Sequence, residues 1–176
     1  LVNDILSKIE PFKPYFIPVN KHGLNSRENI LRLEELFASD KCIVIFPSGL
    51  VSRKKRGIVQ DLEWRKTFVT KAKKYNKPIY PVYISGQNSN RFYKIAKWRS
   101  LFAIKINLEM FFLVDEMFKQ KGNTIEITMG RLIEPKFLDS KKNDSEWAQV
   151  IKNYVYNIQN NINLEFIESI KNEKNY

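Results

Sequence analysis

Two apolar runs of strand length, separated by a helix-length amphipathic segment, place the strongest constraint on this chain. The first run, CIVIF at residues 42–46, is apolar at every position, as in a strand buried on both faces. Residues 61–75 carry apolar side chains on one helical face and Lys and Arg on the other. The second run, IYPVYI, occupies residues 79–84. A strand, a crossover helix and a second strand normally form a parallel βαβ unit. The sequence therefore predicts an α/β fold with a mostly parallel sheet flanked by helices.

Further periodic segments extend this alternation. Apolar residues recur at helical spacing over residues 27–38 and 145–159, and residues 91–118 are expected to be helical in one or two pieces. TIEITMG alternates like a final strand. The strands that we expect to neighbour one another lie near residues 42–46, 78–84 and 124–129.

The organisation along the chain indicates one domain. No internal repeat and no Gly/Ser-rich linker is visible, so we predict a single domain over residues 1–160 and a C-terminal tail over residues 161–176. The sequence starts at Leu1 and not at Met, and we expect it to be the C-terminal portion of a longer protein.

The charge indicates a negatively charged partner. Lys and Arg number 30 and Asp and Glu 19, which leaves a formal net charge of +11. Nucleic acid, an anionic membrane surface or an acidic substrate would fit this surplus. No apolar run approaches about 18 residues, so no membrane span is predicted. The single cysteine, Cys42, is expected to be a buried, inert thiol, and Trp64 is expected to belong to the core.

The stretch FPSGLVSRKKRG, residues 46–57, has the composition of an anion-binding loop. It leaves the carboxyl end of the predicted CIVIF strand, where ligands bind in open α/β sheets. Gly49 allows close approach of the backbone, Ser48 and Ser52 can donate hydrogen bonds, and Arg53 can bind phosphate or carboxylate through two parallel bonds. A solvated basic loop is the alternative interpretation.

Three other segments leave two interpretations each. Asn88 and Ser89 form a polar loop that is either a turn or part of a site. In RFYKIAKWRSLFAIK, residues 91–105, bases alternate with aromatic residues, which suits a helix lying on an anionic membrane or a core helix with a basic outer face. Asp61 and Glu63 are expected to begin the helix that follows, because acids suit a helix N-terminus, although a role in a site is the alternative.

Several of these motifs together resemble a known family. FPSGLVS resembles the third motif, F-P-E-G-T-R-S, of the lysophospholipid (PlsC-like) acyltransferases, and YPV at residues 80–82 resembles the fourth. YFIPVNKHG occupies the place of the second motif, whose basic residue would be Lys21. Longer runs such as INLEMFFLVDEMFKQKGNTIEITMGRLI resemble the bacterial, hemolysin-like subgroup, which includes enzymes that add a second acyl chain to N-acylated amino acids. The resemblance covers about residues 2–135 and implies a glycerol-3-phosphate-acyltransferase-like fold.

The chain departs from the family pattern at two places. The family's catalytic motif is H-x-x-x-x-D, but the only histidine, His22, is separated by four residues from Arg27. We therefore predict no catalytic residue in this chain, and we expect the histidine and aspartate to lie upstream of Leu1. Ser48 and Leu50 stand where the family has Glu and Thr. This difference disfavours glycerol 3-phosphate and lysophosphatidate as acceptors, whereas a carboxylated acceptor, such as an N-acyl amino acid, would still need Arg53.

The resemblance also implies the reaction and its partners. A fatty acyl chain would pass from acyl carrier protein or acyl-CoA to a hydroxyl of a lyso-lipid, with no other cofactor and no metal. The protein would be cytoplasmic and peripheral on the inner face of the bacterial membrane. The residues predicted to bind the acceptor or its anion are Ser48, Gly49, Ser52, Arg53 and Lys21. The residues predicted to line the site are Pro47, Pro81, Asn88 and Ser89.

Two other functions remain as alternatives. A non-catalytic acyltransferase-like scaffold would also lack the catalytic motif. A basic nucleic-acid-binding domain would fit the charge, but no helix-turn-helix, RNA-recognition or zinc pattern is present, so we expect no nucleic-acid partner. The sequence does not indicate the oligomeric state.

Overall fold

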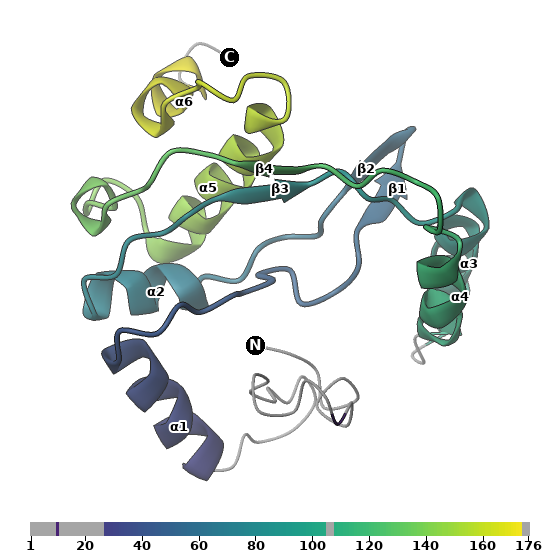
Figure 1. Cartoon of the computed structure of the whole chain (residues 1–176), viewed down its shortest axis with the longest axis horizontal. Coiled ribbons are helices and arrows are strands. Elements are labelled where there is room, and N and C mark those ends of the chain that lie inside the picture. Colours follow the sequence, from purple (N-terminus) through teal and green to yellow (C-terminus); the bar gives the residue numbers. More distant parts are fainter. Residues whose placement is uncertain (1–9, 11–26, 105–107, 174–176) are drawn as a thin grey trace. The chain divides into compact units, whose positions relative to one another are not determined.

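The computed structural model describes Glu10, residues 27–104 and residues 108–173. These residues form a mixed α/β structure of helices and short antiparallel sheets (Figure 1). They group into two compact units, and each is described by itself. Unit 1 contains the residues up to Gly49, Trp64–Ile79 and Leu132–Val150. Unit 2 contains Leu50–Glu63, Tyr80–Arg131 and the residues from Ile151 onward.

Unit 1 is mainly helical. Its elements are α1 (Arg27–Ala38), α2 (Thr67–Lys74), the short 3-10 helix η4 (Pro135–Phe137) and the first half of α5 (Asp144–Ile158). Phe37 of α1 stacks on Tyr75 with ring centroids 6.2 Å apart, and Glu34 forms an ion pair with Lys74 at 2.9 Å. These contacts fix α1 against α2, and α1 matches its prediction over residues 27–38.

Trp64 and the start of α2 show one correct and one wrong prediction. Trp64 is buried and lies edge-on to Phe68, so its place in the core is confirmed. The helix begins at Thr67, so the expectation that Asp61 and Glu63 begin it was wrong. The amide of Gln149 provides the reason. It accepts from the Trp64 N–H at 3.3 Å and donates to the Trp64 carbonyl at 2.8 Å, so both peptide groups are used outside a helix.

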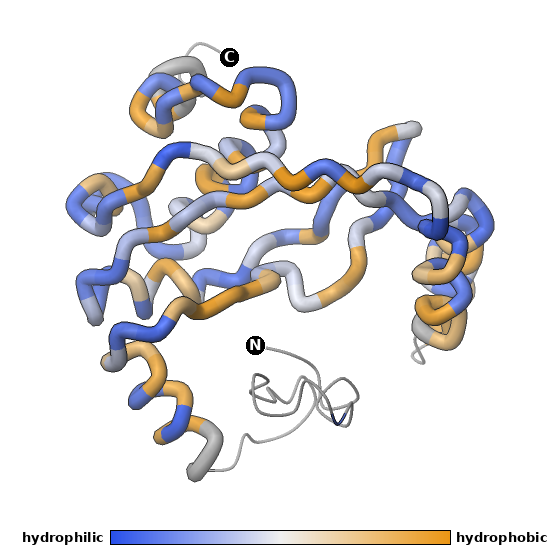
Figure 2. The backbone as a smooth tube through the Cα atoms, viewed as in Figure 1, coloured by the Kyte–Doolittle hydropathy of each residue, from blue (hydrophilic) through white to orange (hydrophobic). Residues whose placement is uncertain are grey.

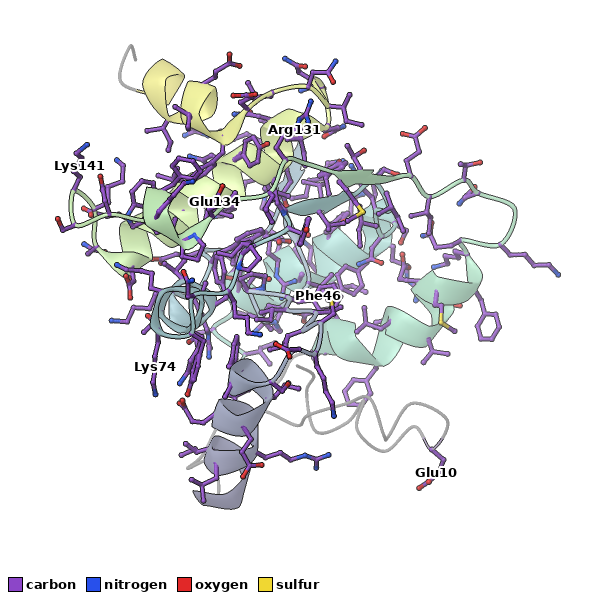
Figure 3. The ribbon with its side chains drawn as sticks, turned by 60° about the vertical axis from the view of Figure 1, so that its left-hand side comes forward. Glu10, Phe46, Lys74, Arg131, Glu134 and Lys141 are labelled. Carbon is purple, nitrogen blue, oxygen red and sulfur yellow. The ribbon has the colours of Figure 1, made fainter. Side chains whose placement is uncertain are left out.

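The CIVIF segment is the largest departure from the predicted fold. Among the described residues it pairs with no strand, although it forms the continuous apolar stretch after α1 in Figure 2. Val44 is 64% exposed and Phe46, labelled in Figure 3, is 63% exposed, while Ile43 and Ile45 are half-buried. The predicted strand buried on both faces is therefore wrong. Cys42 is exposed, so its predicted burial is wrong as well.

Unit 2 contains two antiparallel strand pairs. β1 (Arg53–Lys55) pairs with β2 (Ile58–Gln60), and β3 (Val82–Ile84) pairs with β4 (Ile127–Met129). The predicted strands near 78–84 and 124–129 are therefore neighbours, as expected. The direction of pairing differs from the prediction, because β3 and β4 are antiparallel. The predicted parallel arrangement is therefore not confirmed for the described strands. In both β3 and β4 the residues alternate between exposed and half-buried, so only one face of each strand is covered. This pattern suits antiparallel pairing.

The helices of unit 2 include one that the sequence did not predict, within the expected tail at residues 161–176. They are α3 (Asn90–Leu101), η3 (Leu108–Phe112), α4 (Leu113–Phe118), the second half of α5 and α6 (Phe166–Glu173). The prediction of helix in pieces over residues 91–118 is confirmed, and α5 lies within one residue of its predicted bounds. Tyr154 of α5 is fully buried, and its hydroxyl donates to the Leu164 carbonyl at 2.8 Å and accepts from the Arg131 N–H at 3.2 Å.

Gly130 gives a testable constraint on packing in unit 2. A Cβ at this position would meet Ile158 and Pro81 at 3.1 Å each. We expect Gly130→Ala to lower the free energy of unfolding by about 1–3 kcal/mol, measured by urea denaturation. Gly86→Ala is the matched control, because its Cβ would meet Ile125 at an ordinary 3.6 Å. Equal stability of the two variants would contradict the tight packing at Gly130.

Candidate anion-binding site around Arg53

The basic stretch after residue 50 is an ordered hairpin and not a loop. Lys55 pairs with Ile58, so Arg56 and Gly57 form a two-residue turn between β1 and β2. Their φ angles are 49° and 87°, as a type I′ turn requires, and glycine meets this requirement without strain. The hairpin therefore gives the neighbouring bases fixed and different directions. Arg53 is largely buried, whereas Lys54 and Lys55 are exposed.

Arg53 is bound on two sides. Its Nη1 donates to the Val51 carbonyl at 2.6 Å and to the Ser52 carbonyl at 3.3 Å. Its Nη2 donates to Oε1 of Glu109 at 2.6 Å. Burial lowers the pKa of Arg53, Glu109 raises it and Arg99 lowers it again. A guanidinium remains charged under all these influences and has five N–H donors, more than these three bonds use.

Glu109 of η3 is the centre of this cluster. Its side chain is 1% exposed and lies between two guanidinium groups. Arg99 of α3 approaches from the other side, with Nε 2.9 Å from Oε2 but without the alignment of a hydrogen bond. Two cations thus surround one carboxylate. The Arg53–Glu109–Arg99 cluster therefore has an excess of positive charge in a poorly hydrated environment, where an additional anion would be attracted strongly.

Ser52 has a specific partner as well. Its hydroxyl donates to Oδ1 of Asp61 at 2.6 Å. The Asp61 backbone N–H donates to the Tyr156 hydroxyl at 2.8 Å, and its carbonyl accepts from Lys152 at 2.7 Å. Burial raises the pKa of Tyr156. Asp61 therefore connects the start of the hairpin to α5, in place of the predicted role at the N-terminus of a helix.

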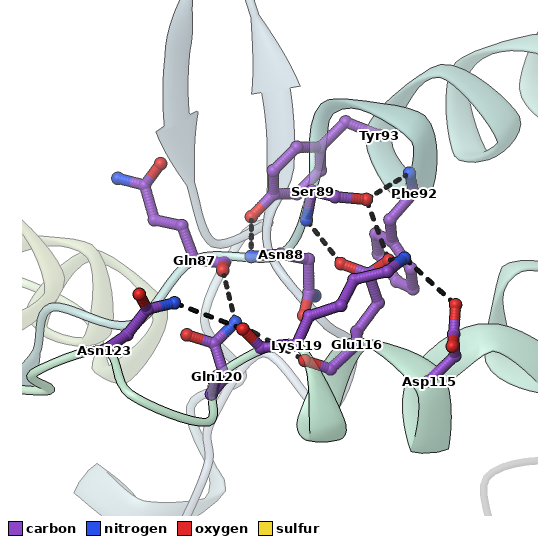
Figure 4. Close-up of polar contacts among 10 residues, drawn as sticks. All are labelled: Gln87, Asn88, Ser89, Phe92, Tyr93, Asp115, Glu116, Lys119, Gln120 and Asn123. Carbon is purple, nitrogen blue, oxygen red and sulfur yellow. Dashed lines mark hydrogen bonds and ion pairs between the residues drawn. The ribbon is translucent and has the colours of Figure 1, made fainter.

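Asn88 and Ser89 belong to the network that begins α3 (Figure 4). The Ser89 hydroxyl caps the helix by accepting from the Phe92 N–H at 3.3 Å, and it donates to Glu116 at 2.7 Å. The Ser89 backbone N–H also donates to Glu116, and the Asn88 N–H donates to the Tyr93 hydroxyl at 3.1 Å. The two residues therefore hold the loop before α3 in a fixed conformation, and their contact with a ligand stays a prediction.

Glu116 is a second buried carboxylate that the sequence reasoning missed. It belongs to α4 and its side chain is 2% exposed. Nζ of Lys119 lies 2.8 Å from its Oε1. Burial raises the pKa of Glu116, but the hydrogen bonds from Lys119 and Ser89 outweigh burial and lower it. Glu109 and Glu116 each interrupt an apolar run in the sequence, and this pattern could have marked both as buried and paired.

The other predicted residues fall into three places. Pro81 lies buried in unit 2, and its carbonyl accepts from the Gly130 N–H at 2.9 Å. Pro47, Ser48 and Gly49 belong to unit 1. There the Gly49 N–H donates to the Phe46 carbonyl at 3.1 Å in a tight turn, and Gly49 has a φ of 60°. Lys21 and His22 lie outside the described residues. Ser52, Arg53, Pro81, Asn88 and Ser89 all belong to unit 2.

Neither a metal-binding cluster nor a membrane-spanning helix is found in the part of the chain that the structure describes. No group of three His, Cys, Asp or Glu side chains in that part could hold a metal ion. None of its helices has the length and apolarity needed to cross a bilayer.

Comparison with known proteins adds a family and two relatives. The sequence model of the family described as "Acyltransferase" matches residues 1–165. The chain is 40% identical over 158 residues to the lyso-glycine lipid O-acyltransferase of Phocaeicola vulgatus, an alignment covering 90% of the chain and 57% of the relative. It is 37% identical over 158 residues to the protein of the same name from Bacteroides thetaiotaomicron, covering 90% of the chain and 58% of the relative. The chain thus spans less than two thirds of either relative. No solved structure matches it.

Proposed function

The chain belongs to the acyltransferase family, and from that membership we propose that the protein transfers a fatty acyl chain to a hydroxyl of a lyso-lipid. The acceptor is an N-acylated amino acid of the lyso-glycine lipid class, and the donor is acyl carrier protein or acyl-CoA. The observation that carries the proposal is the 40% identity over 158 residues to a lyso-glycine lipid O-acyltransferase. Residues 1–160 act as one domain of glycerol-3-phosphate-acyltransferase-like fold, followed by the tail 161–176.

The charge around Arg53 supports a carboxylated acceptor. A glycine head group ends in a carboxylate, which two parallel N–H donors of a guanidinium fit well. Arg53 has donors beyond those bound to Glu109, Val51 and Ser52, and Arg99 adds a second cation to the cluster. In the proposed mechanism Arg53 binds and orients the acceptor and takes no part in proton transfer.

The remaining roles follow from the family resemblance. A histidine held by an aspartate removes the proton of the acceptor hydroxyl, and the oxygen then attacks the thioester carbonyl. Ser48, Gly49, Ser52 and Lys21 contribute to anion binding, and Pro47, Pro81, Asn88 and Ser89 line the site. The reaction takes place at the inner face of the bacterial cytoplasmic membrane, where the protein is peripheral.

An acyl-transfer assay tests this proposal. The protein encoded by the complete reading frame is offered lyso-glycine lipid, lysophosphatidate and glycerol 3-phosphate, each with acyl carrier protein and CoA thioesters. We expect product with lyso-glycine lipid and little with the two phosphate acceptors. Absence of transfer to every acceptor would favour the non-catalytic scaffold.

The isolated 176-residue chain is expected to show no transfer above background in the same assay. It contains one histidine, His22, and no H-x-x-x-x-D motif, so it lacks the base of the proposed mechanism. Activity of this chain would contradict that mechanism, and loss of the activity in His22→Ala would then identify the base.

A further inference from the structure

The helices α3 and α4 and the 3-10 helix η3 expose an unusual number of large apolar side chains. Seven of them, which we call the α3–α4 apolar face, are each between 62% and 77% exposed. They are Trp98, Leu101, Phe102, Phe111, Val114, Met117 and Phe118. α3 and α4 each contact η3, and Figure 2 shows apolar turns in both helices. Monomeric proteins rarely expose so many large apolar side chains on neighbouring elements to water.

The spacing of these residues gives each helix one apolar side. Trp98 and Leu101 of α3 and its C-cap residue Phe102 stand at i, i+3 and i+4, while the opposite side of α3 buries Phe92 and Ala96. In η3 and α4, Phe111, Val114 and Phe118 stand at i, i+3 and i+7. The exposed apolar residues are therefore arranged as two stripes.

In η3 and α4 the distribution of acidic and apolar side chains is the reverse of that in a helix whose outer side faces water. Among their side chains whose burial the structure describes, the most buried are the carboxylates Glu109 and Glu116, at 1% and 2% exposure. Their outward positions hold aromatic and aliphatic residues. The acids are kept inside by Arg53, Arg99, Ser89 and Lys119. A segment with acids inward and apolar residues outward is suited to an apolar environment on its outer side.

Bases border the apolar residues. Arg91, Lys94 and Lys97 of α3 are exposed, and Lys94 stands one helical turn before Trp98. Lys119 and Lys121 follow α4 and are exposed as well. Among the described residues of α3, η3 and α4, Asp115 is the one exposed acid. The surface thus combines apolar anchors with a positive border, which complements the acyl chains and the anionic head groups of a bilayer.

We propose that the α3–α4 apolar face is the surface by which this protein lies on an anionic membrane, with Trp98, Phe102, Phe111 and Phe118 inserted at the level of the head groups. The inference rests on the proposed action at a membrane and adds the surface that makes the contact. The border of lysines distinguishes this occupant from a second copy of the chain, which would carry the same positive charge.

The fluorescence of Trp98 reports contact of the face with a membrane directly. Of the three tryptophans, Trp64 and Trp147 are buried, whereas Trp98 is 66% exposed. The full chain is mixed with vesicles of phosphatidylcholine alone, or with vesicles in which part of it is replaced by phosphatidylglycerol. We expect a blue shift of the Trp98 emission and protection from aqueous acrylamide with the anionic vesicles, both weakened by salt. An unchanged Trp98 emission at saturating anionic lipid, or protection from acrylamide before lipid is added, would overturn the proposal.

Paired variants locate the surface. Phe111→Ser should weaken vesicle binding about tenfold, whereas Ile162→Ser, at a 60% exposed position outside the face, should leave it unchanged. Lys97→Gln should weaken binding roughly fivefold, and Lys141→Gln, at an exposed position labelled in Figure 3, should have no effect. Equal effects within each pair, or a change of oligomeric state in Phe111→Ser, would overturn the proposal.

The proposed acyl transfer and the proposed membrane-binding surface can be refuted independently. Vesicle binding is measured without donor or acceptor, and acyl transfer is measured on acceptor dispersed in detergent. Binding through the face without transfer would refute the proposed reaction alone. Transfer without any dependence of vesicle binding on the face would refute the membrane surface alone.

Discussion

Glu109→Ala is expected to lower the free energy of unfolding by about 3–5 kcal/mol, the largest stability effect anticipated for this chain. The carboxylate is 1% exposed and lies 2.6 Å from Arg53 and 2.9 Å from Arg99. Its removal leaves two largely buried guanidinium groups facing each other without a counter-charge. For a protein of this size the effect corresponds to a fall in melting temperature of about 2–4 °C per kcal/mol.

Three further variants give this prediction its controls. Asp115→Ala removes an acid that is 56% exposed and pairs with Lys119, so its effect should stay within about 0.5 kcal/mol. Glu109→Gln keeps the shape of the side chain, and its loss of unfolding free energy should lie between those of Glu109→Ala and Asp115→Ala. A double variant, Glu109→Met with Arg99→Met, should recover part of the loss, because an apolar pair replaces the ion pair. If Glu109→Ala and Asp115→Ala unfold at the same urea concentration, the cluster is not a stabilising element.

Arg53→Ala is expected to weaken the apparent affinity for the acceptor roughly ten- to a hundred-fold and to leave the thioester donor's KM largely unchanged. A charge-assisted bond in a desolvated site contributes about 1.5–3 kcal/mol, which converts to that range. Arg53→Lys should restore part of the affinity, because an ammonium group cannot make two parallel bonds to a carboxylate. The measurement is the KM of each substrate in the protein encoded by the complete reading frame.

A comparison with Arg99→Ala separates acceptor binding from support of the fold. Both variants remove one cation from Glu109, so both should destabilise the cluster. A larger rise of the acceptor KM in Arg53→Ala identifies Arg53 as the group that contacts the acceptor. Equal rises would mean that Arg53 acts through the fold. Lys55→Ala removes an exposed base of the same strand and should leave the KM of both substrates unchanged.

Helices were predictable here because their signal is local. All the apolar positions that predicted α5, from Trp147 to Ile158, are buried in the structure, and α1 has its expected bounds. α2 begins later than its pattern suggested because Gln149 takes the peptide groups of Trp64, and no local pattern shows that contact.

Strand pairing was less predictable because it is decided by distant partners. The apolar run at residues 42–46 predicted burial on both faces, but a continuous apolar run does not reveal which strands lie beside it. The direction of the β3–β4 pair likewise depends on residues that are far apart in the sequence.

For the candidate site, the sequence singled out Arg53 as an anion-binding residue, which stays a prediction, but it did not reveal the Glu109 partner that the structure shows. Glu109 lies 56 residues away, beyond the reach of any spacing argument. The Ser52 hydroxyl was expected to donate a hydrogen bond to a ligand, but in the structure it donates to Asp61. A carboxylate that interrupts an apolar run was the one available signal, since burial of such a group demands a cation nearby.

The buried carboxylate of Glu109 also selects the register of the β1–β2 hairpin. Four consecutive bases, Arg53 to Arg56, could in principle slide past the facing strand, and a shift by one residue would exchange the two faces of β1. Among alignments that differ by one residue, only the observed one presents a guanidinium to Glu109. A slipped hairpin would offer either the hydroxyl of Ser52 or the ammonium of Lys54, and neither reproduces the bonding geometry of Arg53. A run of interchangeable charges thus acquires a unique alignment from one acid in a distant part of the chain.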